Sequence, residues 1–109
     1  MTLDLGPATR GHALILPKNH FSDLYDIDEE TAAKAMVLAK KMITKLKDVL
    51  GCDGYNIVQN NGAVAGQTVF HFHMHLIPRY EGDGAGIASW KQGELSEKDK
   101  EEILKKLKD

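Results

Sequence analysis

The stretch 71-HFHMHLIPRY-80 decides the fold, because it combines an apolar run with three of the chain's five histidines. Side chains alternate between the two faces of a strand, so His71, His73 and His75 are predicted to share one face. The bulky apolar residues between them are expected to pack on a helix. Three adjacent imidazoles in a dry core would lack hydrogen-bond partners, so the histidine face is predicted to meet solvent or a ligand.

Apolar runs and turn residues around this stretch predict an α+β domain. Short apolar runs bounded by glycine, proline or asparagine predict strands at residues 12–17, 54–60 and 68–78. The last two are expected to form a hairpin across a short loop. A long helix is predicted within residues 26–51, residues 81–94 are predicted to be loop, and Ser96 is expected to cap a C-terminal helix. This order favours an antiparallel sheet with the long helix packed on it, and residues 1–109 are predicted to be one domain.

The long helix has a clear apolar stripe and clear end signals. Asp26 with Glu29 has the form of a capping box, Asp28 is the competing N-cap, and Gly51 is expected to end the helix. Residues at three- and four-residue spacing predict the buried face. They are Ala32, Ala35, Met36, Ala39, Met42, Ile43, Leu46, Val49 and Leu50.

Composition narrows the functional classes. A net charge of −2 argues against a surface built for nucleic acid or anionic lipid. No run approaches the ~20 apolar residues of a membrane span. The single cysteine, Cys52, excludes an intramolecular disulfide and fits a reducing compartment. We therefore expect a cytoplasmic protein that binds neither nucleic acid nor membrane.

The residues before the histidines favour phosphate chemistry. Three histidines can hold a zinc ion, but neutral imidazole is also a good nucleophile toward phosphorus. Gly66, Gln67 and Thr68 supply neutral hydrogen-bond donors that suit phosphate oxygens. No carboxylate or cysteine lies between Gly54 and Arg79 to complete a metal site. On the residues alone, a metal site and a purely structural cluster remain open as alternatives.

Three separated segments resemble the histidine triad (HIT) superfamily. The pattern in 71-HFHMHLI-77, preceded by 66-GQT-68, resembles the family signature. In addition, 11-GHALILPKNH-20 resembles the first core strand and 58-VQNNGAVAGQT-68 the phosphate loop. The resemblance implies a HIT-like fold and an enzyme that binds a purine nucleotide. It implies release of AMP or GMP through a covalent nucleotidyl-histidine, with no cofactor required.

The resemblance also assigns roles to single residues. His73 would attack the α-phosphorus, and His75 would hold the phosphate or protonate the leaving group. His71 would orient His73 through its backbone carbonyl, and His12 is a further histidine of the site, although a strand-start position also explains it. The implied substrate-binding residues are Asp4 and Leu5 for the ribose and base, and Asn60, Gly66, Gln67 and Thr68 for the phosphate and leaving group.

One departure from the family concerns zinc. Many HIT proteins hold a structural zinc with an N-terminal Cys-x-x-Cys and histidines at the positions of His20 and His71. This sequence keeps both histidines and lacks the cysteine pair and the segment that usually precedes Asp4. We expect no metal in the site, and a structural zinc only if such a cysteine pair exists upstream. Because this segment is absent, we expect a fragment, a natural short form, or a family member whose nucleotide pocket is completed by other residues.

Several functions are consistent with the resemblance. The leading prediction is a Hint-like nucleotide phosphoramidase, acting as a homodimer that continues one sheet across the partner. A Fhit-like dinucleoside polyphosphate hydrolase is the enzyme alternative, suggested by 78-PRYEGDG-84 followed by 88-ASW-90. A nucleotide-binding module with weak turnover and a metal-binding protein are the others. Trp90 either anchors its own segment or reaches a partner's site.

Overall fold

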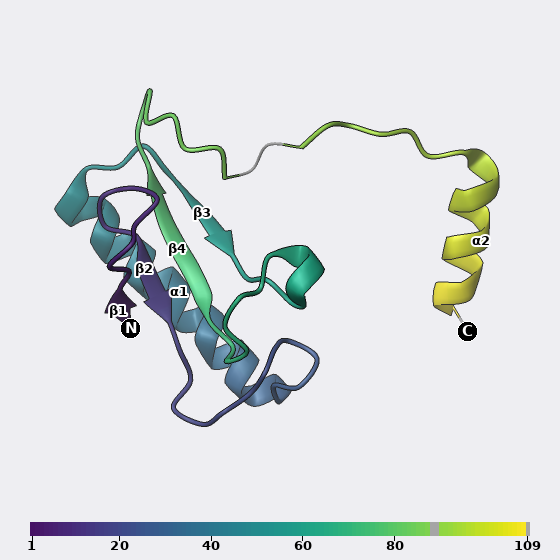
Figure 1. Cartoon of the computed structure of the whole chain (residues 1–109), viewed down its shortest axis with the longest axis horizontal. Coiled ribbons are helices and arrows are strands. Elements are labelled where there is room, and N and C mark those ends of the chain that lie inside the picture. The colour runs from purple at the N-terminus through teal and green to yellow at the C-terminus, as the bar shows by residue number, and fades with distance from the viewer. Residues whose placement is uncertain (88–89, 109) are drawn as a thin grey trace.

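The computed structural model describes residues 1–87 and 90–108. A four-stranded sheet of order β1-β2-β4-β3 carries the helix α1 on one face, whereas the helix α2 stands apart from them (Figure 1). All neighbouring strands are antiparallel, so the predicted α+β class is confirmed. The elements are β1 (Thr2–Leu3), β2 (Ala13–Ile15), α1 (Glu29–Leu50), β3 (Gly54–Val58), the 3₁₀ helix η1 (Ala63–Ala65), β4 (Met74–Arg79) and α2 (Glu97–Lys108).

The ends of α1 follow from local hydrogen bonds. Asp28 is the N-cap, because its carboxylate accepts the Thr31 N–H. The capping box predicted at Asp26 is wrong, since that carboxylate accepts the Ser22 N–H instead. Gly51 ends the helix as predicted, with a left-handed φ of 65° and an N–H that donates to the Lys47 carbonyl.

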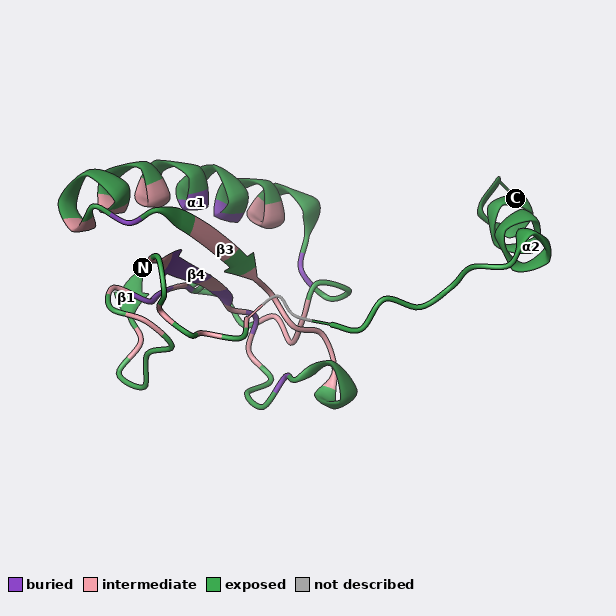
Figure 2. Ribbon diagram, turned by 90° about the horizontal axis from the view of Figure 1, so that it is seen from above, coloured by how far each residue is buried: buried purple, intermediate pink, exposed green. Residues whose placement is uncertain are grey.

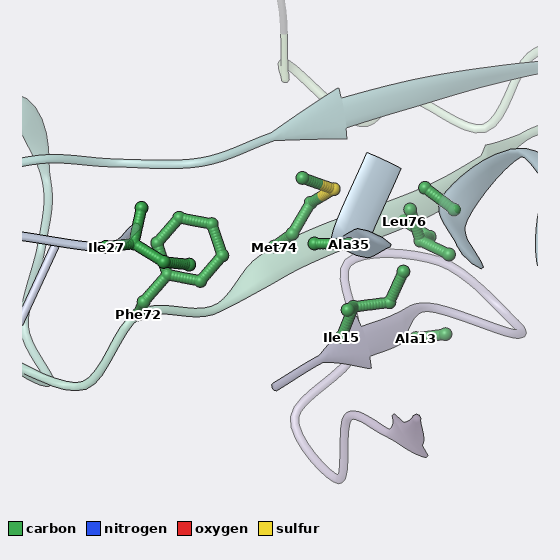
Figure 3. Packing of buried hydrophobic residues seen from close by; sticks show 8 residues of the cluster. Ala13, Ile15, Ile27, Ala35, Phe72, Met74 and Leu76 are labelled. Atoms are coloured by element: carbon green, nitrogen blue, oxygen red, sulfur yellow. The ribbon is translucent and has the colours of Figure 1, made fainter. Parts of the chain in front are cut away.

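The core lies between α1 and the sheet (Figures 2 and 3). Ala35 and Ala39 are the buried residues of α1, and they let the helix approach the sheet closely. Two predicted members of the stripe, Met36 and Val49, are exposed, because Met36 lies on its flank and Val49 in the last turn. The core cluster consists of Ala13, Ile15, Ile27, Ala35, Ala39, Phe72, Met74 and Leu76.

The predicted hairpin is present, but its strands are shorter and its loop is longer. β3 pairs with β4 from Gly54 opposite Arg79 to Val58 opposite His75, and residues 59–73 connect them. β4 begins only at Met74, because the preceding segment bonds to a loop instead of a strand. The Phe72 N–H donates to the Phe21 carbonyl after β2. The extended backbone still buries Phe72, Met74 and Leu76 in alternation, as predicted.

The segment that leads to α2 leaves the body of the protein. The predicted loop over 81–94 contains no helix or strand among its described residues, and residues 88–89 lie outside them. Ser96 caps α2 as predicted, since its hydroxyl accepts the Asp99 N–H at 3.2 Å. The radius of gyration of 16.6 Å exceeds the ~13 Å expected for a compact chain of this length. Neither described helix is long and apolar enough to cross a membrane.

Gly11→Ala is expected to destabilise the fold by about 2–3 kcal/mol, because it adds a forced shift of a neighbouring side chain to backbone strain. Gly11 has φ 90°, and a Cβ there would meet Leu50 Cδ1, the end of a flexible side chain that would have to rotate away. Gly82→Ala is the control, since φ is 71° but no atom lies within 4 Å of its Cβ, and about 1–2 kcal/mol is expected. Urea unfolding measures both losses. Equal losses would contradict the steric part of this argument.

Candidate active site

Strand β4 and the segments that precede β2 and β4 carry four histidines on the side of the sheet away from α1. His71, His73 and His75 are half-buried while the residues between them are buried, so the predicted alternation is confirmed. His75 lies on β4 opposite Leu14 of β2. His12 directly precedes β2 and is buried, with its ring 5.1 Å from that of His75.

A main-chain carbonyl determines the tautomer of His73. Its Nδ1 lies 2.8 Å from the carbonyl oxygen of His71. A carbonyl oxygen only accepts, so Nδ1 carries the hydrogen and the neutral ring has its lone pair at Nε2. The predicted hydrogen bond from His73 to the His71 carbonyl is therefore present, and it leaves His73 Nε2 as a free nucleophilic nitrogen.

A second chain of hydrogen bonds determines the tautomer of His75. The Ala8 N–H donates to His12 Nδ1 at 3.0 Å, so the hydrogen of neutral His12 is on Nε2. That atom lies 2.9 Å from His75 Nδ1 and donates to it. His75 then carries its own hydrogen on Nε2. The site thus has one bare nitrogen, on His73, and a neighbouring ring that offers an N–H, with centroids 5.0 Å apart.

The surroundings of His75 favour its neutral form. Burial lowers the pKa of His75 below its ordinary value of 6.5, and the neighbouring His73 and His12 lower it further. Asp4 opposes these effects. Its carboxylate oxygen lies 3.6 Å from His12 Nε2. Near neutral pH, His75 is therefore an uncharged donor.

This lowered pKa predicts a loss of stability in mild acid. Between the folded and the unfolded pKa, the unfolded chain binds more protons at His75 than the folded chain does. Stability therefore falls as pH drops through about 6.5. The melting temperature is expected to fall less for His75→Gln than for the parent between about pH 7.5 and pH 5.5. Identical falls in the two proteins would contradict the assignment.

His71, His73 and His75 do not form the metal centre that was the alternative to phosphate chemistry. The rings of His71, His73 and His75 bond to different partners, and His71 Nε2 donates to the Pro17 carbonyl at 3.2 Å. His71 and His20 do approach each other, with their Nδ1 atoms 3.1 Å apart, so the zinc pair implied by resemblance is in contact. No cysteine or carboxylate joins this pair among residues 1–87 and 90–108, so these residues do not fit a four-ligand zinc site.

One other group has the spacing of metal ligands. Donor atoms of Asp4, His12 and His75 lie within 4.8 Å of one another. A cation there would have to displace the proton that His12 donates to His75. The hydrogen bonds already account for this cluster without an ion.

The phosphate loop is organised differently from the prediction. The amide of Gln67 is buried and fully engaged within the chain: its oxygen accepts the Gly62 N–H at 2.8 Å. Its nitrogen donates to the carbonyls of Ser22 and Val69. In this conformation Gln67 shapes the loop and does not offer its amide to a phosphate. Thr68 is exposed and makes no hydrogen bond to another described residue, so it is the available donor of the pair.

The remaining predicted contacts are only partly assembled. Asp4 is placed beside His12, and its other oxygen accepts the Gly6 N–H at 2.8 Å. Asn60 lies next to Gly66, and its amide nitrogen would be 3.6 Å from a Cβ added to that glycine. Leu5 is 98% exposed, so it does not form an enclosed pocket for a base with its described neighbours.

Two groups that hold the site were missed. They are the Ala8 N–H, which fixes His12, and the Pro17 carbonyl, which fixes His71. Every residue has a main-chain carbonyl, and every residue except proline has a main-chain N–H. Residue types therefore do not indicate which of these groups will bind a side chain.

The sequence is similar to proteins of one family. The HIT domain family model matches residues 1–82. The HIT-like protein MJ0866 of Methanocaldococcus jannaschii is 45% identical over 97% of this chain and 79% of its own length. Adenosine 5'-monophosphoramidase HNT1 of Saccharomyces cerevisiae is 43% identical over 81% of this chain and 53% of its own length.

Solved structures share the fold. A HIT family protein from Bacillus anthracis aligns with a TM-score of 0.88 and 36% identity, over 97% of this chain and 77% of its own. That coverage is large enough for the alignment to extend into α2, which ends at Lys108.

Proposed function

The chain belongs to the HIT domain family, and on that premise we propose that it hydrolyses nucleotide phosphoramidates to AMP or GMP. The observation that carries the proposal is the pair of opposite tautomers. His73 presents a bare Nε2, and its neighbour His75 presents an Nε2–H. A nucleophile and an acid side by side are what cleavage of a P–N bond requires.

The reaction follows in two displacements. His73 Nε2 attacks the α-phosphorus, a phosphorus–nitrogen bond forms, and the bond to the leaving amine breaks as His75 gives that nitrogen its proton. At the same time the Nε2 proton of His12 passes to His75 Nδ1, and His12 takes a proton from solvent that is released again in the second step, so neither ring becomes an anion. In the second step His75 takes a proton from water, the water oxygen bonds to phosphorus, and the bond to His73 breaks. The nucleoside monophosphate is released and both histidines regain their starting forms.

The positive charge on His73 in the intermediate has a partner. Once its Nε2 is bonded to phosphorus, the ring carries a proton on Nδ1 and is cationic. That N–H already donates to the His71 carbonyl, and this hydrogen bond strengthens when the donor becomes charged. The carbonyl therefore stabilises the intermediate more than the free enzyme.

The nucleotide is proposed to lie between the histidines and Asp4. The Asp4 carboxylate, half-exposed beside His12, is suited to accept two ribose hydroxyls. Leu5 would then pack on the purine, and Thr68 would donate to the phosphate. The relative HNT1, named as an adenosine 5'-monophosphoramidase, supports adenine as the base and the amide as the substrate.

The segment that suggested dinucleoside polyphosphates has a structural role here. Arg79 forms two hydrogen bonds of 2.8 Å with the Asp83 carboxylate, which closes the turn after β4. Tyr80 donates its hydroxyl to the Arg10 carbonyl. These hydrogen bonds engage Arg79 and Tyr80 within the fold, and this favours the phosphoramidase. Residues 88–89 of the same suggestion lie outside the described residues.

A substrate comparison tests the proposal. The protein is incubated with an AMP–alkylamine conjugate and, separately, with diadenosine triphosphate and tetraphosphate, with and without a chelator. Faster release of AMP from the amide, unaffected by chelation, is expected. Faster cleavage of the polyphosphates would overturn it. Binding of AMP without turnover would instead identify a nucleotide-binding module.

We also propose that the protein is a cytoplasmic homodimer. β3 is an edge strand of the sheet, so its outer hydrogen-bonding groups are available to a second strand. Beside it, Ile57 and the exposed Met36 and Val37 of α1 line an apolar groove. A two-fold dimer built across this edge would cover both features.

A further inference from the structure

We propose that Thr9 is a positioning residue that keeps the proton of His75 on Nε2; this rests on the function proposed above, in which His75 protonates the leaving group. Thr9 belongs to residues 5–11, which connect β1 to β2 and which we term the β1–β2 loop. The loop lies beside the end of β4 (Figure 1). It supplies the Ala8 N–H, one of the main-chain groups that fix the histidines. Whatever holds this loop therefore also fixes the proton donor.

Two side-chain hydrogen bonds attach the β1–β2 loop to the end of β4. Residues 5–8 and Arg10 are exposed, so apolar burial contributes little to holding the loop. The Thr9 hydroxyl donates to the Pro78 carbonyl at 2.6 Å, and the Tyr80 hydroxyl donates to the Arg10 carbonyl at 2.7 Å. The Thr9 bond is partly buried, whereas the Tyr80 bond is exposed. Because hydrogen bonds are stronger away from water, Thr9 is the main restraint on the loop.

The Thr9 hydroxyl takes the place of a strand partner for β4. β2 pairs with β4 only as far as Ala13 opposite Leu76. The Pro78 carbonyl lies two residues further along β4, beyond this last pair. Pro78 is fully buried, so its carbonyl needs a hydrogen-bond donor from within the chain. Threonine or serine at position 9 supplies that donor, and valine does not.

The Ala8 N–H, next to Thr9 in the chain, determines which nitrogen of His12 carries the hydrogen. It donates to His12 Nδ1 at 3.0 Å. The Asp4 carboxylate favours the same tautomer, but it lies 3.6 Å from His12 Nε2, too far for a hydrogen bond. Without the Ala8 N–H, His12 can take the other tautomer, in which Nε2 is bare. His75 Nδ1 would then donate to it, and His75 Nε2 would have no proton for the leaving group.

The tautomer of His12 is measured without a substrate. In protein that carries nitrogen-labelled histidine, NMR correlation spectra of the ring distinguish hydrogen on Nε2 from hydrogen on Nδ1. At about pH 8, where histidine is ordinarily neutral, we expect the Nε2–H form in the parent and a mixture of both forms in Thr9→Val. Thr9→Ser keeps the hydroxyl and is expected to retain the parent spectrum. A His12 tautomer that is unchanged in Thr9→Val would overturn the proposal, whatever the activity.

The kinetic test depends on the leaving group. Thr9→Val is expected to lower kcat for the AMP–alkylamine by about 5-fold or more, with KM within about 2-fold, because the amine needs the His75 proton. With the p-nitrophenyl ester of AMP, whose leaving group needs no proton, kcat should stay within about 2-fold. Thr9→Ser should restore the parent rate. Equal losses with the two substrates would contradict the proposal, because they would indicate general damage to the site.

Two further variants separate positioning from stability. Thr44→Val is the matched control, because it also removes a hydroxyl that donates to a main-chain carbonyl, that of Lys40 at 2.8 Å on α1. Its rates should stay within about 2-fold of the parent with both substrates. In a His12→Ala background, Thr9→Val should cost no further rate with the AMP–alkylamine, because Thr9 acts through His12. A full additional loss there would refute this coupling. A parent protein that releases no AMP would refute the proposed function alone, since the NMR measurement requires no turnover.

Discussion

His73→Ala is expected to lower kcat for release of AMP from an AMP–alkylamine by at least about 10²-fold, because the variant cannot form the covalent intermediate. Among the histidines that the structure describes, only His73 combines a bare ring nitrogen with a main-chain partner that fixes it. Its Nδ1 is held 2.8 Å from the His71 carbonyl, so Nε2 points its lone pair away from that contact. Rapid acid quenching during turnover should show one nucleotidyl group on the parent protein and none on the variant.

His73→Asn separates the loss of the nucleophile from a loss of structure. The asparagine amide can still donate to the His71 carbonyl, but it is not a nucleophile toward phosphorus. We expect this variant to be as inactive as His73→Ala, with an unchanged melting temperature and retained binding of AMP. A nucleotidyl adduct on His73→Asn, or activity close to that of the parent, would refute the assignment of His73.

The parts of the fold that sequence predicted well depend on local periodicity. Residues Ala35 and Ala39 are three to four positions from their apolar neighbours, and Phe72, Met74 and Leu76 alternate with the histidines. Both patterns are set by backbone geometry, so they hold whatever surrounds them. The end of α1 at Gly51 was predicted for the same reason, because a left-handed residue there favours glycine.

The features that the sequence did not show depend on contacts between distant segments. Gln67 is adjacent to the histidine segment in sequence, yet its amide binds the Ser22 carbonyl across 45 positions. The late start of β4 has the same origin, since Phe72 bonds to Phe21. A single sequence gives residue types at each position, but it does not give the partner that satisfies each polar group.

The same distinction applies to the candidate site. The presence of His71, His73 and His75 on one face was predicted from alternation. The hydrogen bond from His73 to the His71 carbonyl was implied by the family resemblance. The protonation of His75 was not predicted, because it depends on the Ala8 N–H and on His12, which is 63 positions from His75. Likewise, an amphipathic pattern predicted α2, but no pattern showed that its apolar stripe would be left uncovered.

The second large effect concerns His75 and depends on the leaving group. With an AMP–alkylamine, His75→Ala is expected to lower kcat/KM by about 10²–10⁴-fold, because an alkylamide anion cannot leave unprotonated. With the p-nitrophenyl ester of AMP the loss should stay within about 10-fold, since p-nitrophenolate leaves without a proton. The ratio of the two losses therefore isolates proton donation from any general damage to the site.

His12 supplies the matched comparison for that experiment, because it acts only through His75. Its Nε2–H donates to His75 Nδ1 at 2.9 Å and keeps the proton of His75 on Nε2, where the leaving group is. His12→Ala removes this donor, and we expect a loss of about 10-fold or more that is again confined to the alkylamine substrate. His12→Gln retains an N–H donor and should recover part of the lost rate. If both His75→Ala and His12→Ala slowed the two substrates equally, the histidine pair would be holding the phosphate and not supplying the proton.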